Sequence, residues 1–518
     1  MKRYLWVLLG ALLVLYFLLR LPYVGHLLIW DEAMNLCTVR SLVSHGQDYY
    51  SGWFWRHPPA LDVVLMLVRP LAAGFAERAQ VLVICVGTLN ALVLFLLNRR
   101  TLGAGPALWA TFFYAVMPGA AFHDVWLKQD VFAILFGLLA VHAFVRRRAP
   151  LAGLLLGLAF LGKETALFYA MAVGVLWLFR ERPERRIRDL VLIGVLAGVT
   201  SGWWYLGFST ALRYFLAFVT GLPLAATDIS VWTRPWYFYL KLLPLDLGWG
   251  GVALCLAGVV AIWRVRPPDA HSPTCPPACP PKPWRRRKPE GRRRIRPFVS
   301  SSVLWPLAVL VPAYLLLSVM RGKAPWFVVA LYPTLATLQG VGADGLVRAL
   351  RSLFERTPAL GRAGPRLLAG GLAILVAWAF VWNAWGRDYE ESLRQREWPI
   401  WWGSYASREA ALTLNRLARE GDRVLVTPMH YWLGEKPIPC AIFVYYLGGF
   451  SVVVRPYDLS ADDLVAAVKE HKLDWAMVSP DPVEAEQKLL GPLRKKYGLE
   501  PLSLQGACIY KTEGIYRE

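Results

Sequence analysis

Residues 30–59 read WDEAMNLCTVRSLVSHGQDYYSGWFWRHPP, and they follow an N-terminal apolar segment. The stretch opens on the acidic pair Asp31-Glu32 and closes on His57-Pro58-Pro59, with clustered aromatic side chains between them: Tyr49, Tyr50, Trp53, Phe54 and Trp55. Carboxylates, imidazoles and aromatic rings together are unusual in a short connection between membrane helices. The combination favours a site where a sugar and a lipid headgroup meet, held over a membrane surface by the other apolar segments.

Apolar runs of about 20 residues recur along the 518-residue chain, which is 56% hydrophobic. A helix of that length spans about 30 Å of hydrocarbon, so the sequence predicts an α-helical polytopic membrane protein. We expect about eleven spans, roughly at 4–21, 79–97, 106–122, 130–145, 150–162, 164–180, 189–208, 248–263, 299–319, 326–343 and 367–385. The first is interpreted as an uncleaved span, because no small-residue cleavage site follows it.

The formal net charge of +21 at pH 7 does not indicate nucleic-acid binding. Its basic residues lie in blocks between the apolar runs: 99–100, 146–148, 180–188, 264–296 and 348–366. Such blocks are typical of cytoplasmic loops. With the N-terminus in the cytoplasm, every block falls on the cytoplasmic side, and the 30–59 stretch falls outside. An odd number of spans also exports everything after Trp385, as in a multi-pass protein of a bacterial or archaeal plasma membrane.

The chain divides into two predicted parts. Residues 1–390 form the transmembrane domain, which contains a Pro- and Arg-rich cytoplasmic loop at 264–298 without a folded core. Residues 391–518 read as an extracytoplasmic α/β domain. Its expected helices are 407–420, 461–471 and 483–497, and its expected strands are 423–427, one within 445–454, 474–478 and 507–511.

Asp31 admits two interpretations from its position just before an expected helix over 33–45. As an N-cap it would accept hydrogen bonds from free backbone N–H groups. As an ionised carboxylate just outside the membrane it would be a general base that activates a hydroxyl or amine. A helix N-terminus favours the ionised form, so the two roles can coexist.

Further polar residues stand where the predicted topology places the outer ends of helices. His57 precedes two prolines and could contact a phosphate or an acceptor, or only complete a turn. The cluster His123, Asp124, Lys128, Gln129 and Asp130 is costly at membrane depth and therefore a functional candidate. A structural ion pair between Lys128 and Asp124 is the alternative.

Three basic sites also fall on the predicted outer face, where cations should be sparse. They are Lys163, Arg321 and Lys323, the last followed by Ala324-Pro325-Trp326. One such side chain would simply extend to the lipid headgroups. Three of them favour an anion held at the interface, such as a lipid phosphate.

The seven cysteines form no metal-binding pattern. Cys275 and Cys279 have only His271 nearby, which falls short of the four ligands of a zinc site. The cationic side chains suffice for a phosphate, and on that basis we predict no divalent metal and no other cofactor. Cys440 and Cys508 could pair if their domain faces an oxidising compartment.

These residues, taken as an ordered set, resemble a known family over roughly residues 1–345. The chain is similar to the GT-C glycosyltransferases that use lipid-linked sugars, in particular the protein O-mannosyltransferase-like group that includes the aminoarabinose transferases of lipid A. The resemblance rests on Asp31-Glu32, His57-Pro58-Pro59-Ala60, Asp130 at the start of a helix, 157–163 (GLAFLGK), and Lys323-Ala324-Pro325-Trp326-Phe327 with Tyr332-Pro333. It departs from the family at Ala60, where leucine is usual, and at Gly162-Lys163-Glu164, where Thr-Lys-Gly is commoner.

The resemblance implies an inverting transfer of sugar from a polyprenyl-phosphate donor on the extracytoplasmic face. It implies that Asp31 is the general base, and that Glu32 and Asp130 support or orient it. Lys163, Arg321 and Lys323 would hold the donor phosphate, and His57, Lys128 and Trp326 would contact substrate. Fixed cations suit this reaction, because the leaving group is already a stable anion.

Two other functions remain open at this stage. A lipid-linked-sugar flippase would place its ionisable residues near the midplane, often in repeated halves, whereas these acids cluster at one surface and no repeat is found. A membrane-anchored binding protein acting through its outer domain would leave Asp31, Asp130 and Lys323 unexplained. The sequence identifies neither the sugar nor the acceptor, which could be a lipid, a glycan or a protein.

Overall fold

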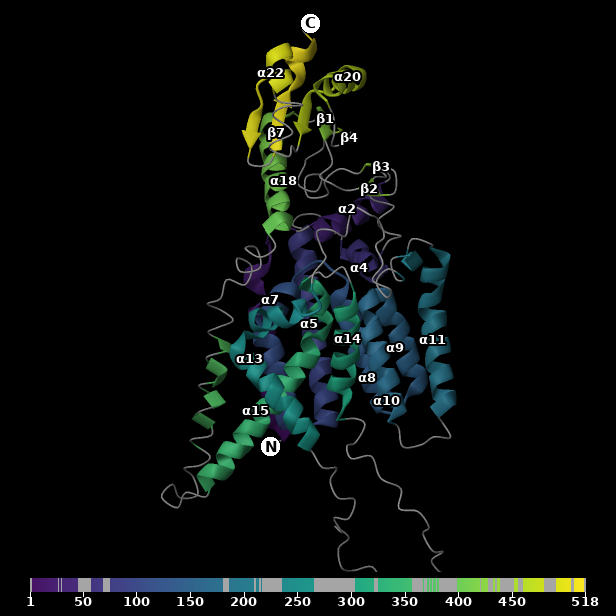
Figure 1. Ribbon diagram of the computed structural model, residues 1–518, viewed down its shortest axis with the longest axis vertical. Helices are drawn as coiled ribbons and strands as arrows, with labels where there is room; N and C mark the ends of the chain where they lie inside the picture. The colour runs from purple at the N-terminus through teal and green to yellow at the C-terminus, as the bar shows by residue number, and fades with distance from the viewer. Residues whose placement is uncertain are drawn as a thin grey trace, which may run out of the picture.

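The computed structural model describes residues 2–44, 57–68, 75–179, 186–216, 235–264, 303–320, 325–355 and 398–516. Within these ranges it omits 27, 29, 209–210, 214–215, 420, 427–431, 434–435, 438–450, 455–459, 479–490 and 505–506, and between 367 and 381 it describes isolated positions. A bundle of helices forms the lower part of the elongated molecule, and an α/β unit stands above one end of it (Figure 1).

The bundle consists of apolar helices in the order that hydropathy predicts. They are α1 (Lys2–Leu18), α5 (Phe75–Thr101), α6 (Ala104–Val116), α8 (Asp130–Val145), α9 (Ala149–Gly162), α10 (Leu167–Leu178), α11 (Arg186–Gly207), α13 (Phe238–Arg264), α14 (Trp305–Val319) and α15 (Tyr332–Glu355). Four helices in the described part of the chain are long and apolar enough to cross a membrane, and five shorter helices are also apolar. Every predicted span up to 326–343 overlaps one of these helices, and span 367–385 lies largely outside the described residues.

The spans predicted at 164–180 and 326–343 each begin as a 3-10 helix before α10 and α15 start. Two further spans differ because of proline and glycine. The expected helix over 106–122 is two helices, α6 and the short α7 (Pro118–His123). Met117 between them is extended, as the residue before a proline prefers. The span expected at 248 begins ten residues earlier, at Phe238, and bends at Gly248, whose φ of 72° favours glycine.

Helices α13 and α15 pack closely at positions where both carry glycine, which has no side chain. A Cβ on Gly258 of α13 would lie 2.0 Å from the carbonyl oxygen of Leu338 on α15. On the other side of the same contact, a Cβ on Gly342 would lie 2.2 Å from the carbonyl oxygen of Leu254. The backbones of α13 and α15 can therefore approach only because both positions are glycine.

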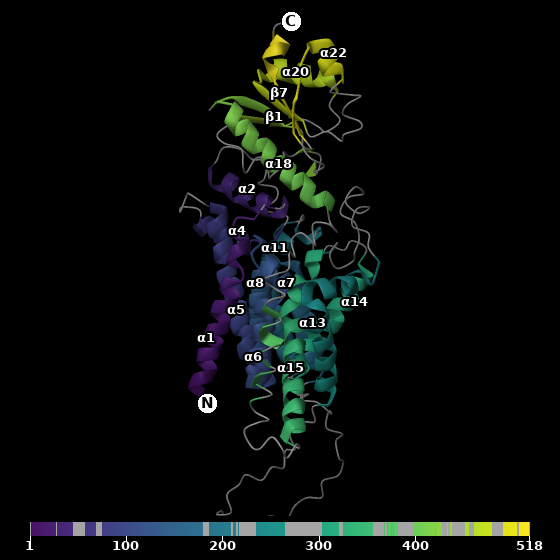
Figure 2. The ribbon, with the colours of Figure 1, turned by 90° about the vertical axis from the view of Figure 1, so that its left-hand side faces the viewer.

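Short elements cover one end of the bundle. They are α2 (Trp30–Ser44), α4 (Ala60–Val68), α7 and the 3-10 helices η3 (Glu164–Ala166) and η5 (Pro325–Leu331). Helix α2 crosses above the bundle, and the N-terminus lies at the opposite end (Figure 2). The helix expected over 33–45 is α2, and because it begins at Trp30, Asp31 lies in its first turn.

The C-terminal unit is a mixed sheet with helices, as the alternation of the sequence predicts. Its sheet has the order β4-β1-β5-β7-β6, from β1 (Arg423–Val426), β4 (Ser451–Val454), β5 (Trp475–Val478), β6 (Leu502–Leu504) and β7 (Ala507–Lys511). Strands β4, β1 and β5 are parallel, whereas β7 is antiparallel to both β5 and β6. The sequence did not predict β6, nor the small pair β2 (Trp432–Leu433) and β3 (Lys436–Pro437).

Three described helices accompany the sheet: α18 (Trp398–Leu417), α20 (Ala461–His471) and α22 (Gly491–Tyr497). Of the helix expected over 483–497, the first part is outside the described residues. Helix α18 lies between the sheet and α2 (Figure 2). One cluster of buried apolar side chains runs from α2, α4 and α5 to α18 and the sheet, with Ala410 and Leu414 of α18 among its members. Of the predicted loop at 264–298, Arg264 is the last residue of α13 and the rest lies outside the described residues, as does the domain boundary at 390. Both stay predictions.

Candidate active site

The candidate site lies where α2 covers the end of the bundle. Three segments far apart in the sequence meet there: the first turn of α2, the loop between α7 and α8, and the break between α9 and η3. Together with the first turn of α8, these segments bring four charged side chains that the sequence singles out: Asp31, Lys128, Asp130 and Lys163. Two are carboxylates and two are ammonium groups.

Asp31 and Lys128 form the first ion pair of the site. Lys128 Nζ lies 3.0 Å from Asp31 Oδ2, and the two side chains are 5% and 36% exposed respectively. Burial raises the pKa of Asp31, but the opposing charges of Lys128, His57 and Lys163 outweigh it and leave the pKa below its ordinary value. Asp31 is therefore ionised at neutral pH, partly open to solvent, and able to accept a proton.

Asp130 and Lys163 form the second ion pair. Lys163 Nζ lies 2.5 Å from Asp130 Oδ2, and both side chains are nearly buried. Lys163 has an extended backbone that ends α9. The preceding Gly162 lets this break approach α8, since a Cβ there would lie 2.7 Å from the backbone nitrogen of Ala133. The first turn of α8, where Asp130 stands, favours an ionised carboxylate.

Glu32 turns away from these pairs and binds the loop that carries Lys128. It is fully buried, and its Oε1 accepts a hydrogen bond of 2.9 Å from the backbone N–H of Leu127. Its Oε2 lies 2.9 Å from His26 Nε2. One turn along α2, Asn35 Nδ2 donates to the carbonyl oxygen of Leu127 at 2.7 Å. Helix α2 thus holds both backbone polar groups of Leu127.

The remaining predicted residues are placed as follows. His57 lies close enough to Asp31 to lower its pKa. Asp124 pairs with Arg20 at 3.0 Å, and Lys128 pairs with Asp31, so the alternative ion pair between Lys128 and Asp124 is wrong. Gln129 is buried, and its Nε2 lies 3.4 Å from Asn35 Oδ1. Arg321 and Lys323 lie outside the described residues, as does the side chain of Trp326 in η5.

Sequence reasoning missed three residues that organise the site: Arg20, His26 and Asn35. Asn35 stands four residues after Asp31, and that spacing on a helix was an available signal. Among the described residues, no three His, Cys, Asp or Glu side chains come together as a possible metal site. Cys440 is outside the described part, so its pairing with Cys508 stays a prediction.

The family model described as dolichyl-phosphate-mannose-protein mannosyltransferase matches residues 56–205. The lipid A galacturonosyltransferase RgtD of Rhizobium johnstonii is 28% identical over 174 residues, which are 30% of this chain and 37% of that protein. The chain thus matches little more than a third of the length of this curated relative.

Solved structures extend the likeness to nearly the whole chain. ArnT from Cupriavidus metallidurans, bound to undecaprenyl phosphate, superposes with a TM-score of 0.58 at 15% identity, over 98% of each chain. The apo oligosaccharyltransferase of Archaeoglobus fulgidus superposes with a TM-score of 0.57 at 12% identity, over 95% of this chain and 71% of that one. The chain has the GT-C glycosyltransferase fold. This GT-C protein is a multi-pass membrane protein, and the resemblance that its motifs suggested is confirmed.

Proposed function

We propose that this GT-C protein is an inverting glycosyltransferase that moves a sugar from a polyprenyl-phosphate carrier to an acceptor. The observation that carries the proposal is the pair of carboxylate–lysine contacts at one end of the bundle. Asp31 is ionised and reachable from solvent, and two nearly buried lysines, Lys128 and Lys163, stand beside it. A base and fixed cations in one place suit a reaction whose leaving group is a phosphate.

The chemistry assigns a role to each charged group. The Asp31 carboxylate takes the proton from the acceptor hydroxyl or amine as that atom attacks the anomeric carbon. The bond between the anomeric carbon and the phosphate oxygen breaks, and the polyprenyl phosphate leaves as an anion. Lys128 and Lys163, with Arg321 and Lys323, stabilise the charge on that phosphate. Direct displacement at one centre inverts its configuration.

An apolar cavity within the bundle suits the lipid part of such a donor. It measures about 290 Å³ and lies between α13, α14, η5 and α15. It is lined by Tyr239, Leu240, Leu243, Leu310, Val311, Tyr314, Leu315, Leu317, Val328, Leu331 and Leu335. Leu240, Val311 and Leu315 are exposed at its rim, so an isoprenoid chain could enter from the surrounding lipid.

Charge distribution supports an extracytoplasmic site. Helix α5 begins beside α2, with Ala76 and Ala79 in the same apolar cluster, so Arg99 and Arg100 in its last turn lie at its far end. Helix α8 begins at Asp130 in the site, so residues 146–148, which join it to α9, lie at its far end too. Cytoplasmic loops attract such residues, so α2 and the α/β unit belong to the opposite face. RgtD is a lipid A galacturonosyltransferase, and the ArnT structure was solved with bound undecaprenyl phosphate. Both favour a lipid-linked donor and a lipid acceptor for this chain.

The experiment is sugar transfer in membranes that contain the protein, supplied with a panel of radiolabelled polyprenyl-phosphate sugars. We expect one donor to be consumed, a labelled product that identifies the acceptor, and the same rate in chelator. Loss of transfer in chelator would contradict metal independence. If label crosses the membrane while every donor stays intact, the protein is a flippase and the proposal fails.

A further inference from the structure

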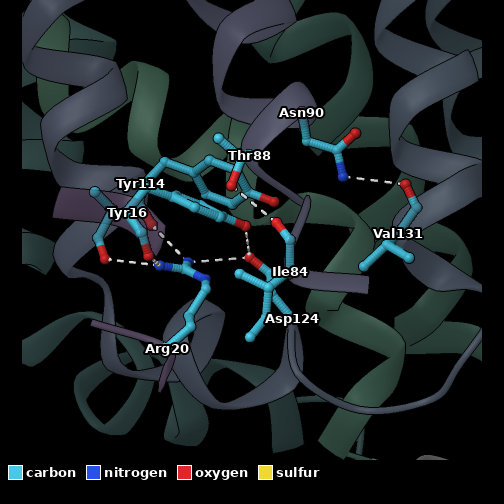
Figure 3. Close-up of polar contacts among 9 residues, drawn as sticks. Tyr16, Arg20, Ile84, Thr88, Asn90, Tyr114, Asp124 and Val131 are labelled. Carbon is cyan, nitrogen blue, oxygen red and sulfur yellow. Dashed lines mark hydrogen bonds and ion pairs between the residues drawn. The ribbon is translucent and has the colours of Figure 1, made fainter. Parts of the chain in front are cut away.

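A buried ion pair joins α1 to the loop that carries Lys128. Arg20 follows α1, and Asp124 opens the segment between α7 and α8; both side chains have no exposed surface. Arg20 Nη2 lies 3.0 Å from Asp124 Oδ2 (Figure 3). The Tyr16 hydroxyl donates to the same carboxylate oxygen, and its ring lies under the guanidinium, 3.3 Å from the centroid to Cζ.

Arg20 also replaces hydrogen bonds that the break in α6 removes. Its Nη1 donates to the carbonyl oxygen of Ala115 at 3.1 Å, and its Nη2 donates to that of Tyr114 at 3.3 Å. In a continuous helix the carbonyl of Tyr114 would accept from residue 118, but Pro118 has no N–H. The arginine therefore satisfies carbonyl groups at the end of α6 and fixes the point where the chain turns toward the site.

The segment beyond Asp124 is held at short intervals by other elements. Leu127 is bound by α2 through Glu32 and Asn35, and Lys128 pairs with Asp31. At its far end, Asn90 Nδ2 of α5 donates to the carbonyl oxygen of Val131 at 3.0 Å (Figure 3). The ion pair of Asp124 with Arg20 is thus the first of several contacts along this segment that set the position of Lys128.

Such a pair is not explained by stability alone. Two charges without exposure lose their hydration, and a well-packed apolar pair of similar volume commonly stabilises a fold as well or better. A buried ion pair does, however, impose one geometry on the groups that it joins, because a displaced partner leaves a charge uncompensated.

We propose that Arg20, Asp124 and Tyr16 form a positioning device that anchors the start of the Asp124–Asp130 loop to α1 and so holds Lys128 against Asp31. These three are positioning residues, since none of them contacts the two ion pairs of the site. The expected effect on sugar transfer rests on the proposed function, whereas the anchoring of the loop does not.

The test compares Asp124→Asn and Tyr16→Phe with wild type and with Thr337→Val. The control removes a buried hydroxyl that Asn98 contacts at 2.9 Å, between α5 and α15 and remote from the loop. Hydrogen–deuterium exchange on the purified full chain monitors the Leu127 amide. We expect exchange roughly tenfold faster in Asp124→Asn, a smaller rise in Tyr16→Phe, and none in the control.

The pH profile of sugar transfer is the second measurement. If the loop no longer holds Lys128 against Asp31, activity on the acid side of the pH profile (the acid limb) should be lost at a pH higher by as much as about one unit. A loss of folded protein alone lowers the rate at every pH. Unchanged Leu127 exchange in both variants, or an equal rise in Thr337→Val, would overturn the inference. Faster Leu127 exchange in the variants, combined with a wild-type protein that transfers no sugar, would support the anchoring of the loop and refute the proposed function. If Asp124→Asn does not fold, Tyr16→Phe decides the matter.

Discussion

Removing the charge of Lys128 should shift the pH dependence of sugar transfer. In the structure Lys128 Nζ lies 3.0 Å from Asp31 Oδ2 and holds the Asp31 pKa down against burial. Lys128→Met deletes that charge while it keeps most of the volume of the side chain. Activity that needs the ionised carboxylate is lost as the pH falls through its pKa, so a higher pKa moves the acid limb upward.

The size of the shift follows from the distance. Two unit charges 3.0 Å apart attract by about 1.4 kcal/mol at the dielectric constant of water. Because the Asp31 side chain is 36% exposed, the water value is the appropriate lower bound. About 1.4 kcal/mol corresponds to about one pKa unit, so we expect the acid limb to rise by about one pH unit or more.

The assay is the pH profile of kcat/KM, measured from about pH 4 to about pH 8 with the purified protein in lipid. Lys241→Met is the matched control, since Lys241 is an exposed lysine of α13 that contacts the Tyr237 ring. The control should keep the wild-type limb. An acid limb that stays in place in Lys128→Met would show that Lys128 does not set the protonation of Asp31.

Two further predictions concern the second ion pair and the helix packing. Lys163→Met leaves the buried Asp130 carboxylate without its cation, so the free energy of unfolding should fall by about 3–5 kcal/mol and the KM for donor should rise; an unchanged thermal midpoint would contradict this. Gly258→Ala places a methyl group 2.0 Å from the Leu338 carbonyl oxygen and should cost about 1–3 kcal/mol in unfolding free energy. Gly198→Ala, with nothing within 4 Å of its Cβ, should instead be neutral or slightly stabilising in the same thermal unfolding measurement.

The membrane fold was predictable because hydropathy marks each span independently of its neighbours. What hydropathy does not register is the conformation of single residues within a span. Pro118 interrupts an apolar run and divides it into α6 and α7, and Gly248 bends α13 without changing the average. In the C-terminal unit, β6 is only three residues long, too short for a clear alternation.

The candidate site was predictable as a set of residues but not as a set of contacts. Asp31, Asp130 and Lys163 occur in a recognisable order along the sequence. Which side chain each one pairs with depends on how distant segments meet in the fold. Arg20 is the clearest case, because in the sequence it only closes the first apolar run. Its role depends on carbonyl groups that the break before Pro118 leaves free, and on a carboxylate more than a hundred residues away.

The most direct test of the account is the transfer rate of Asp31→Asn, measured beside its affinity for polyprenyl phosphate. The amide keeps the shape of the side chain and removes the base. The account predicts that kcat falls by roughly two orders of magnitude or more, while the protein stays folded and polyprenyl phosphate binds with nearly wild-type affinity. An amide variant that transfers sugar as fast as wild type would show that Asp31 is not the base.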